Sequence, residues 1–180
     1  HVYNSDTLGN AVNGVSATDR WIIDDEAGTA TTNEDRTQML WFKNEYSADF
    51  IMEADVTVHK PSEGYHPSVG LISYASQDSI GLYAYTGRNL TDREPGQKVI
   101  SLKTGTQTDG LQWMGGITLS QDVKKDYDSD TVRMKVGKQG GNFYYFYNGE
   151  YWDTEFNEKL AGKVFAGFVA NDGGTFSNYT

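Results

Sequence analysis

The sequence predicts an all-β domain, an antiparallel sandwich or barrel, and three observations carry this prediction. Apolar and polar residues alternate with a period of two through most of the chain, which is typical of strands that bury one face. Turns rich in glycine and asparagine separate these short runs. Helical periodicity is confined to residues 155–161, which are long enough for a turn or two before Gly162.

The clearest early strand covers residues 49–59. Its apolar phase consists of Phe50, Met52, Ala54, Val56 and Val58. The opposite phase is polar and costly to bury, so it faces water or a wet cleft. Two apolar and aromatic runs, residues 69–75 and 80–86, follow it and are joined by a polar loop of ordinary hairpin length.

The last third of the chain predicts a series of hairpins. Residues 131–136 alternate in the same way, and Asn148-Gly149 is the strongest short hairpin signal in the sequence. Residues 164–170 and 175–179 form a final pair of strands. Because the apolar phases must share one interior, we expect a core that contains Phe50, Met52, Val56, Val132, Met134 and Phe168.

Length and composition limit the class of protein. The 180 residues show no repeat, linker or break in composition, which indicates one domain over residues 1–180. An apolar stretch of about 18 residues, as a membrane span needs, is missing, so membrane insertion is excluded. No apolar signal-peptide core is visible at the amino terminus, and the sequence opens at His1, so we expect a mature protein or a module of a larger protein with other domains. The absence of cysteine excludes disulfides and thiol catalysis.

The charge balance excludes two classes of partner. Fifteen basic and 25 acidic residues give a formal net charge of -10, which repels nucleic acid and anionic membranes. The densest basic pair, Lys124-Lys125, is followed at once by Asp126. High glycine, tyrosine, asparagine, aspartate and threonine without cysteine is typical of bacterial extracellular β-domains. We therefore expect a secreted or cell-surface location.

Several catalytic motifs are missing from the sequence. It has no Gly-x-Ser-x-Gly elbow, phosphate loop or dinucleotide fingerprint, and its three histidines are too few for a convincing zinc site. The segment 126–130 begins like an EF-hand calcium loop. Thr131 stands where that loop needs glycine, so an EF-hand is excluded and a solvated acidic turn is favoured.

Glu53 and Asp55 are the strongest candidates for catalytic carboxyls. They share one strand face, as the acids of some glycosidases do, but Thr57 stands where a third acid is needed. Three interpretations stay open: cross-strand ion pairs with Arg133 and Lys135, use in a binding face, or catalysis.

Aromatic side chains point to sugar binding, because sugar rings stack on them. Tyr83 and Tyr85 share the face opposite the apolar phase of their strand, and Trp113 has a glycine-flanked, exposed setting. The polar loop 87–96 brings hydrogen-bonding groups. We predict a ligand site formed by Trp113, Tyr83, Tyr85, Arg88, Asp92 and Arg93.

The alternative for these residues is structural. The tyrosines would then lie under a second sheet, and the arginines would offset local acids. In that case Tyr151 and Trp152, which follow the Asn148-Gly149 turn, are the next candidates for the ligand site.

Three segments resemble the concanavalin A-like jelly rolls. They are residues 131–149, with two strands and a hairpin, the closing hairpin at 166–179, and the early strand at 49–56. The likeness covers most of residues 40–180 and is one of strands and turns rather than of catalytic residues. It implies two sheets with a concave face. The group includes laminin-G-like domains, carbohydrate-binding modules of bacterial enzymes, and some glycosidases.

The resemblance implies a function and a cofactor. It favours a non-catalytic carbohydrate-binding module whose partner is a polysaccharide or oligosaccharide. A glycoside hydrolase or polysaccharide lyase on the same fold, or a surface adhesin domain, are the alternatives. It also implies one structural calcium near a sheet edge, for which Asp24, Asp25 and Glu26 are one candidate cluster, although solvation on the surface is an alternative role.

Overall fold

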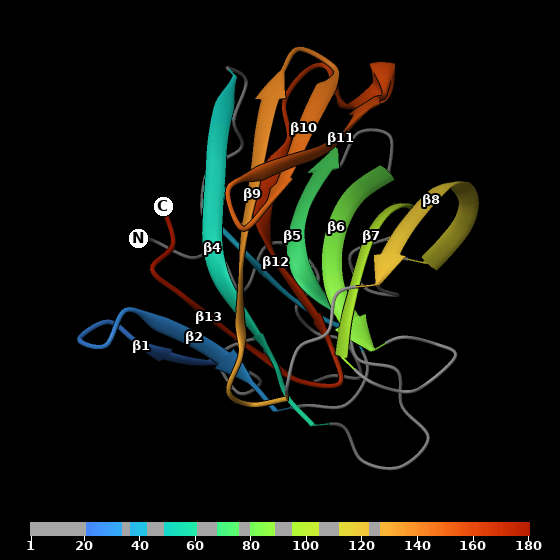
Figure 1. Ribbon diagram of the computed structural model, residues 1–180. Helices are drawn as coiled ribbons and strands as arrows, with labels where there is room; N and C mark the ends of the chain where they lie inside the picture. Colours follow the sequence, from blue (N-terminus) through green and yellow to red (C-terminus); the bar gives the residue numbers. More distant parts are fainter. Residues whose placement is uncertain are drawn as a thin grey trace.

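The computed structural model describes residues 21–33, 37–42, 49–60, 68–75, 80–88, 95–104, 112–122 and 127–180. Across this part of the chain, thirteen strands form two antiparallel sheets that pack face to face (Figure 1). The antiparallel sandwich predicted from the alternation is confirmed. Within the described residues, no helix is both long and apolar enough to cross a membrane.

The first sheet has seven strands in the order β1–β2–β13–β4–β9–β10–β11. Their bounds are β1 Ile22–Asp24, β2 Thr29–Thr32, β13 Gly174–Ser177, β4 Phe50–Val58, β9 Thr131–Gln139, β10 Asn142–Tyr147 and β11 Glu150–Phe156. The second sheet has six strands in the order β3–β12–β5–β6–β7–β8. Their bounds are β3 Thr37–Trp41, β12 Phe165–Asn171, β5 Ser68–Ala75, β6 Ile80–Arg88, β7 Pro95–Thr104 and β8 Gln112–Asp122.

The main core lies between the two sheets and is built from the predicted apolar phases. Met52, Val56, Val132, Met134 and Phe168 are buried there, as predicted. The sixth predicted core residue is half-buried and packs against this core rather than within it: Phe50.

One aromatic pair joins the sheets at the centre of the core. Phe168 of β12 stacks on Phe176 of β13, with ring centroids 4.2 Å apart and an angle of 8° between the planes. Both side chains are fully buried, and each contributes about 2–3 kcal/mol through removal of its apolar surface from water. Consecutive strands therefore belong to opposite sheets and hold them together.

The hairpin signal at Asn148-Gly149 is confirmed by backbone geometry. Both residues have positive φ angles, 52° and 81°, as a tight turn between twisted strands requires. The side-chain oxygen of Asn148 accepts a hydrogen bond from the backbone nitrogen of Arg133 at 2.9 Å, which ties the turn to β9.

Two local features lie at strand ends. Trp113 is the second residue of β8 and pairs with Lys103, and the β7–β8 ladder shifts its register between this pair and the pair Ser101–Thr118, where Gly115 and Gly116 lie. The weak helical signal at 155–161 is confirmed as a single 3-10 turn, η1 (Glu158–Leu160), while Phe156 still belongs to β11. Leu160 anchors that turn because its side chain is fully buried.

Candidate functional site

A second apolar cluster covers the outer face of the six-stranded sheet, away from the main core. Strands β3, β5, β6 and β12 are apolar on both phases, so one phase enters the main core and the other forms this layer. We call it the aromatic layer. Its members are Met39, Trp41, Ile72, Tyr74, Tyr83 and Val169, with Tyr85 and Phe165 partly buried beside them.

Glycines create the room that these large rings need. Three aromatic residues of the layer each stand directly across a ladder from a glycine, where the neighbouring strand presents no side chain. The pairs are Trp41–Gly167, Tyr74–Gly81 and Tyr85–Gly70. A Cβ atom on Gly70 would run into the backbone oxygen of Ala84, so the close approach of these strands also depends on glycine.

The rings of the layer contact one another. Tyr83 and Tyr85 stack, with centroids 4.9 Å apart and 26° between the planes. Trp41 lies 5.6 Å from the ring of Tyr74 and 6.4 Å from the ring of Phe165. Mutual ring contacts hold each side chain in one orientation, which is what a ligand platform requires.

Two polar atoms of the layer differ in their accessibility, because Trp41 is buried and Tyr85 is half-buried. The indole nitrogen of Trp41 is buried and has no hydrogen-bond partner among the described residues. Burial raises the pKa of the Tyr85 phenol above its ordinary value of 10.0, so its hydroxyl stays protonated at physiological pH. A phenol in that state both donates and accepts hydrogen bonds.

Tyr83 and Tyr85 share a face, as predicted. They belong to the aromatic layer and not to the core between the two sheets. Tyr83 is buried, at 7% exposed, as the structural alternative expects, whereas Tyr85 is more accessible. Their role in ligand binding stays a prediction.

The strand pairing places the backbone of Trp113 near the aromatic layer. The β7–β8 ladder pairs it with Lys103, and the β6–β7 ladder pairs Lys103 with Gly81. Position 113 is therefore two strands from β6, at the end where Tyr74 faces Gly81. The side chain of Trp113 lies outside the described residues.

The arginines and the aspartate of the predicted site fall at or beyond the end of β6. Arg88 is the last residue of that strand and pairs with Pro95 across a bulge, but its side chain is not among the described ones. Asp92 and Arg93 lie outside the described residues, so their part of the predicted site stays a prediction.

The sequence analysis missed Trp41 and Tyr74. Both lie in segments that are apolar on both phases, residues 39–42 and 69–75, and this pattern signals a strand buried on both faces. In a sandwich of two sheets, only one face of each strand enters the core between them. Strands that are apolar on both faces therefore predict a second apolar surface on the outside of their sheet, and these two segments carried that signal.

Glu53 and Asp55 form the cross-strand ion pairs expected as one of their three interpretations. Arg133 Nε lies 3.3 Å from Glu53 Oε2, and its Nη1 lies 3.3 Å from Asp55 Oδ1. The same Nη1 donates to the backbone oxygen of Asn178 at 2.7 Å. Lys135, expected to share in this pairing, lies over the ring of Phe146 instead, at 5.3 Å from its centroid. This face is therefore organised by one arginine.

The candidate calcium cluster is spread along β1 and the turn after it. Asp24, Asp25 and Glu26 are all exposed, and Asp24 Oδ1 accepts a hydrogen bond from the backbone nitrogen of Ala27 at 2.9 Å. Among the described residues, no three histidine, aspartate or glutamate side chains converge as a metal site would require. Bound calcium stays a prediction.

Comparison with known proteins gives structural matches. Neither the family models nor the curated proteins match the sequence. The carbohydrate-binding module CBM66 from Bacillus subtilis matches the structure with a TM-score of 0.63 at 12% identity, over 89% of both chains. The fold is a concanavalin-like jelly roll.

Two enzymes share this jelly roll. The κ-carrageenase from Pseudoalteromonas carrageenovora, in complex with an oligotetrasaccharide of κ-carrageenan, matches with a TM-score of 0.60 at 9% identity, over 99% of this chain and 91% of the other. The alginate lyase AlyC3 matches with a TM-score of 0.60 at 7% identity, over 89% of this chain and 78% of the other. At such identities the shared property is the fold.

Proposed function

We propose that this chain is a non-catalytic carbohydrate-binding domain and that its ligand is a polysaccharide or oligosaccharide. The observation that carries the proposal is the aromatic layer, with its stacked pair Tyr83 and Tyr85 on a face that does not enter the main core. The two half-buried rings of the layer, Tyr85 and Phe165, offer surface for the C–H faces of sugars, and the other rings hold them in place. The Tyr85 hydroxyl offers a hydrogen bond.

The proposed site extends from the described layer to the predicted residues beside it. Trp113, Arg88, Asp92 and Arg93 would border the layer on the β8 side and at the end of β6. The arginines would donate to sugar hydroxyls or to a uronate carboxylate. We also propose that the domain belongs to a larger secreted or cell-surface protein, because polysaccharides are met mainly outside the cell.

An enzyme on the same fold is the second candidate function, and the likeness to a carrageenase over 99% of this chain favours it. A retaining or inverting glycosidase needs two carboxyls free to face the sugar. Glu53 and Asp55 are instead held by Arg133, and Asp55 Oδ2 also accepts a hydrogen bond from Asn178 at 2.8 Å. This engagement supports the binding domain over the enzyme.

The proposal is tested by combining a binding screen with an activity assay. The chain is titrated with laminaritetraose, a κ-carrageenan tetrasaccharide, an alginate tetrasaccharide and a mixed-linkage glucan tetrasaccharide, and each mixture is assayed for new reducing ends and for unsaturated products. We expect binding to at least one ligand without cleavage. Cleavage that Glu53→Gln abolishes would establish the enzyme, and a lack of binding to all four would refute the proposal.

A further inference from the structure

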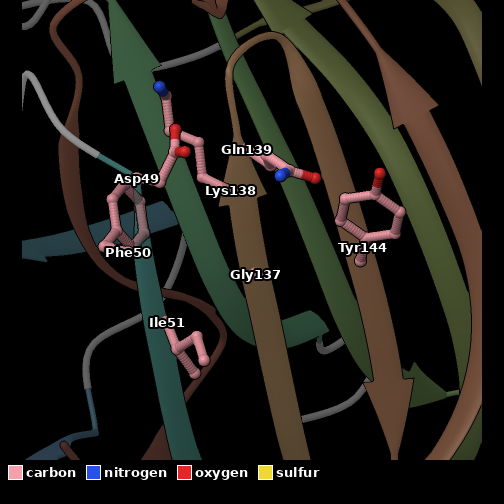
Figure 2. Close-up of a pocket in the computed structure, with 7 residues that line it drawn as sticks. All are labelled: Asp49, Phe50, Ile51, Gly137, Lys138, Gln139 and Tyr144. Carbon is pink, nitrogen blue, oxygen red and sulfur yellow. The ribbon is translucent and has the colours of Figure 1, made fainter.

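A hollow opens on the exposed face of the seven-stranded sheet, on the side of the molecule opposite the aromatic layer. Gly137 of β9 forms its floor, and the ladders place Ile51 of β4 and Tyr144 of β10 directly on either side. Figure 2 shows these two side chains flanking the Gly137 backbone, with the side chain of Gln139 reaching toward Tyr144. The hollow is shallow and open to solvent, and its volume is about 520 Å³.

The hollow exists because a side chain is missing in the middle of a strand. A Cβ atom on Gly137 would meet nothing within 4 Å, so packing does not demand glycine here. Gly137 also has the ordinary extended backbone of β9, so conformation does not demand it either. Glycine inside a strand weakens the strand and often marks a place where a ligand approaches the backbone.

The width of the hollow fits a single saturated ring. Neighbouring strands lie about 4.7–4.9 Å apart, so β4 and β10 are roughly 9–10 Å apart across β9. Ile51, which is 63% exposed, and the half-exposed Tyr144 form the two walls of this slot. Both walls expose apolar surface to water, and removing this surface from water is favourable. A pyranose has two C–H faces, so one ring can contact both walls.

Polar groups gather at one end of the hollow. Asp49 Oδ1 accepts a hydrogen bond from the backbone nitrogen of Gly140 at 2.8 Å, which fixes this carboxylate at the rim. The exposed amide of Gln139 points away from Asp49, toward Tyr144. Lys138 also lines the hollow: its Nζ donates to the backbone oxygen of Ala161 at 3.2 Å, and its ammonium interacts with the Asp49 carboxylate. The two charges at this end therefore have opposite signs and offset one another. An acceptor, an amide and a phenol hydroxyl suit a neutral polyol.

The backbone of β9 argues against a peptide strand as the occupant. Gly137 is paired with Ile51 on one side and with Tyr144 on the other, so its backbone groups already serve two ladders. A peptide that binds a sheet adds a strand at an edge, where such groups are open. A ligand over Gly137 must bring hydrogen-bonding groups for the side chains at the rim, as a sugar does.

We propose that this hollow binds one pyranose residue of a neutral glycan, as a second site on the sheet opposite the aromatic layer. This inference rests on the proposed function, because it assumes that the domain meets glycans. Two sites on opposite faces would let one domain contact two chains of a polysaccharide and would raise its avidity for a dense matrix without any new contact.

Amide chemical shifts of the isotopically labelled chain distinguish the two sites. Laminaritetraose and a mixed-linkage glucan tetrasaccharide serve as neutral probes. We expect the amides of Gly137 and Tyr144 to move in a saturable manner, together with a separate response at Tyr83 and Tyr85. Gly137→Val, which fills the hollow, should weaken binding there at least tenfold and leave the response of the tyrosine pair unchanged.

Matched variants and three outcomes complete the test. Tyr144→Ala should repeat the effect of Gly137→Val, whereas Ile22→Ala, another exposed apolar residue of this sheet, should have none. If Tyr83 and Tyr85 respond while Gly137 does not, the second site is refuted and the proposed function stands. If neither group responds, the second site is refuted, and the κ-carrageenan and alginate tetrasaccharides of the screen decide the proposed function. Shifts at Gly137 that depend on protein concentration without sugar would identify a second copy of this chain as the occupant and refute the glycan site.

Discussion

Tyr83 and Tyr85 stand two residues apart on β6, and their rings stack with centroids 4.9 Å apart. Residues at this spacing share one face of a strand, and across the adjacent ladder they face Ile72 and Gly70. The glycine leaves space into which the Tyr85 ring can lean. Two tyrosines at alternate positions of one strand, with a glycine across from one of them, are therefore enough to form a rigid pair of stacked rings.

Two glycines of the sandwich should respond oppositely to the same substitution. Gly70→Ala places a Cβ atom against the backbone of Ala84, so we expect a loss of stability of about 2–4 kcal/mol. Gly137→Ala places a Cβ atom in open space within a strand, so we expect no loss and a gain of up to about 1 kcal/mol. Urea unfolding of both variants measures the difference, and equal losses would contradict the described packing.

Glu155 should make stability depend on pH. Burial raises the pKa of its carboxyl above the ordinary value of 4.5, and the nearby charge of Asp153 raises it further. Glu155 therefore ionises at a lower pH in the unfolded chain than in the folded chain. As pH rises from 4.5 to the higher pKa of the folded chain, ionisation of Glu155 lowers the free energy of unfolding. Above that pKa the loss stays constant.

The Glu155→Gln variant removes this dependence. We expect its melting temperature to match that of the wild type near pH 4 and to exceed it at pH 7. Glu158→Gln, at an exposed position, is the control and should leave the pH profile unchanged. A wild type that remains the more stable protein at pH 7 would show that the ionised carboxylate of Glu155 is favourably bound.

Calcium removal should lower the melting temperature if the structural ion implied by the fold is present. A ligand that binds only the folded chain stabilises it, and excess chelator removes that contribution. Differential scanning calorimetry with and without chelator measures the change. Asp24→Asn and Glu26→Gln should reduce the effect if the β1 turn holds the ion, and identical melting curves under both conditions would argue against any such site.

The alternation and the turn residues were sufficient to predict most of the fold. Val132 and Phe168 could be assigned to the core because slipping their strands by one residue would expose the whole apolar phase. Asn148-Gly149 predicted its hairpin because few residues adopt two consecutive positive φ angles. The position of Trp113 on β8, paired with Lys103, could not be predicted from its segment, because that pairing joins two strands across a register shift.

The candidate site was less accessible to sequence reasoning. Tyr83 and Tyr85 could be paired because they are neighbours on one strand. Trp41 meets Tyr74 through β12, which comes more than 90 residues after either of them, so no local pattern could place them side by side. The Ile51–Gly137–Tyr144 hollow likewise depends on the register of three strands. Registers between distant strands are set by the whole fold and not by a segment.

Isothermal titration calorimetry on the aromatic layer tests the central claim most directly. The tetrasaccharide that binds best in the screen is titrated into the wild type, Tyr85→Ala and Tyr151→Ala, after melting curves have shown that all three are folded. Loss of one stacking ring removes roughly 1–1.5 kcal/mol, so we expect Tyr85→Ala to bind about tenfold more weakly and Tyr151→Ala, an exposed ring of the other sheet, to bind as the wild type does. Unchanged binding by Tyr85→Ala together with lost binding by Tyr151→Ala would contradict the account and move the principal site to the seven-stranded sheet.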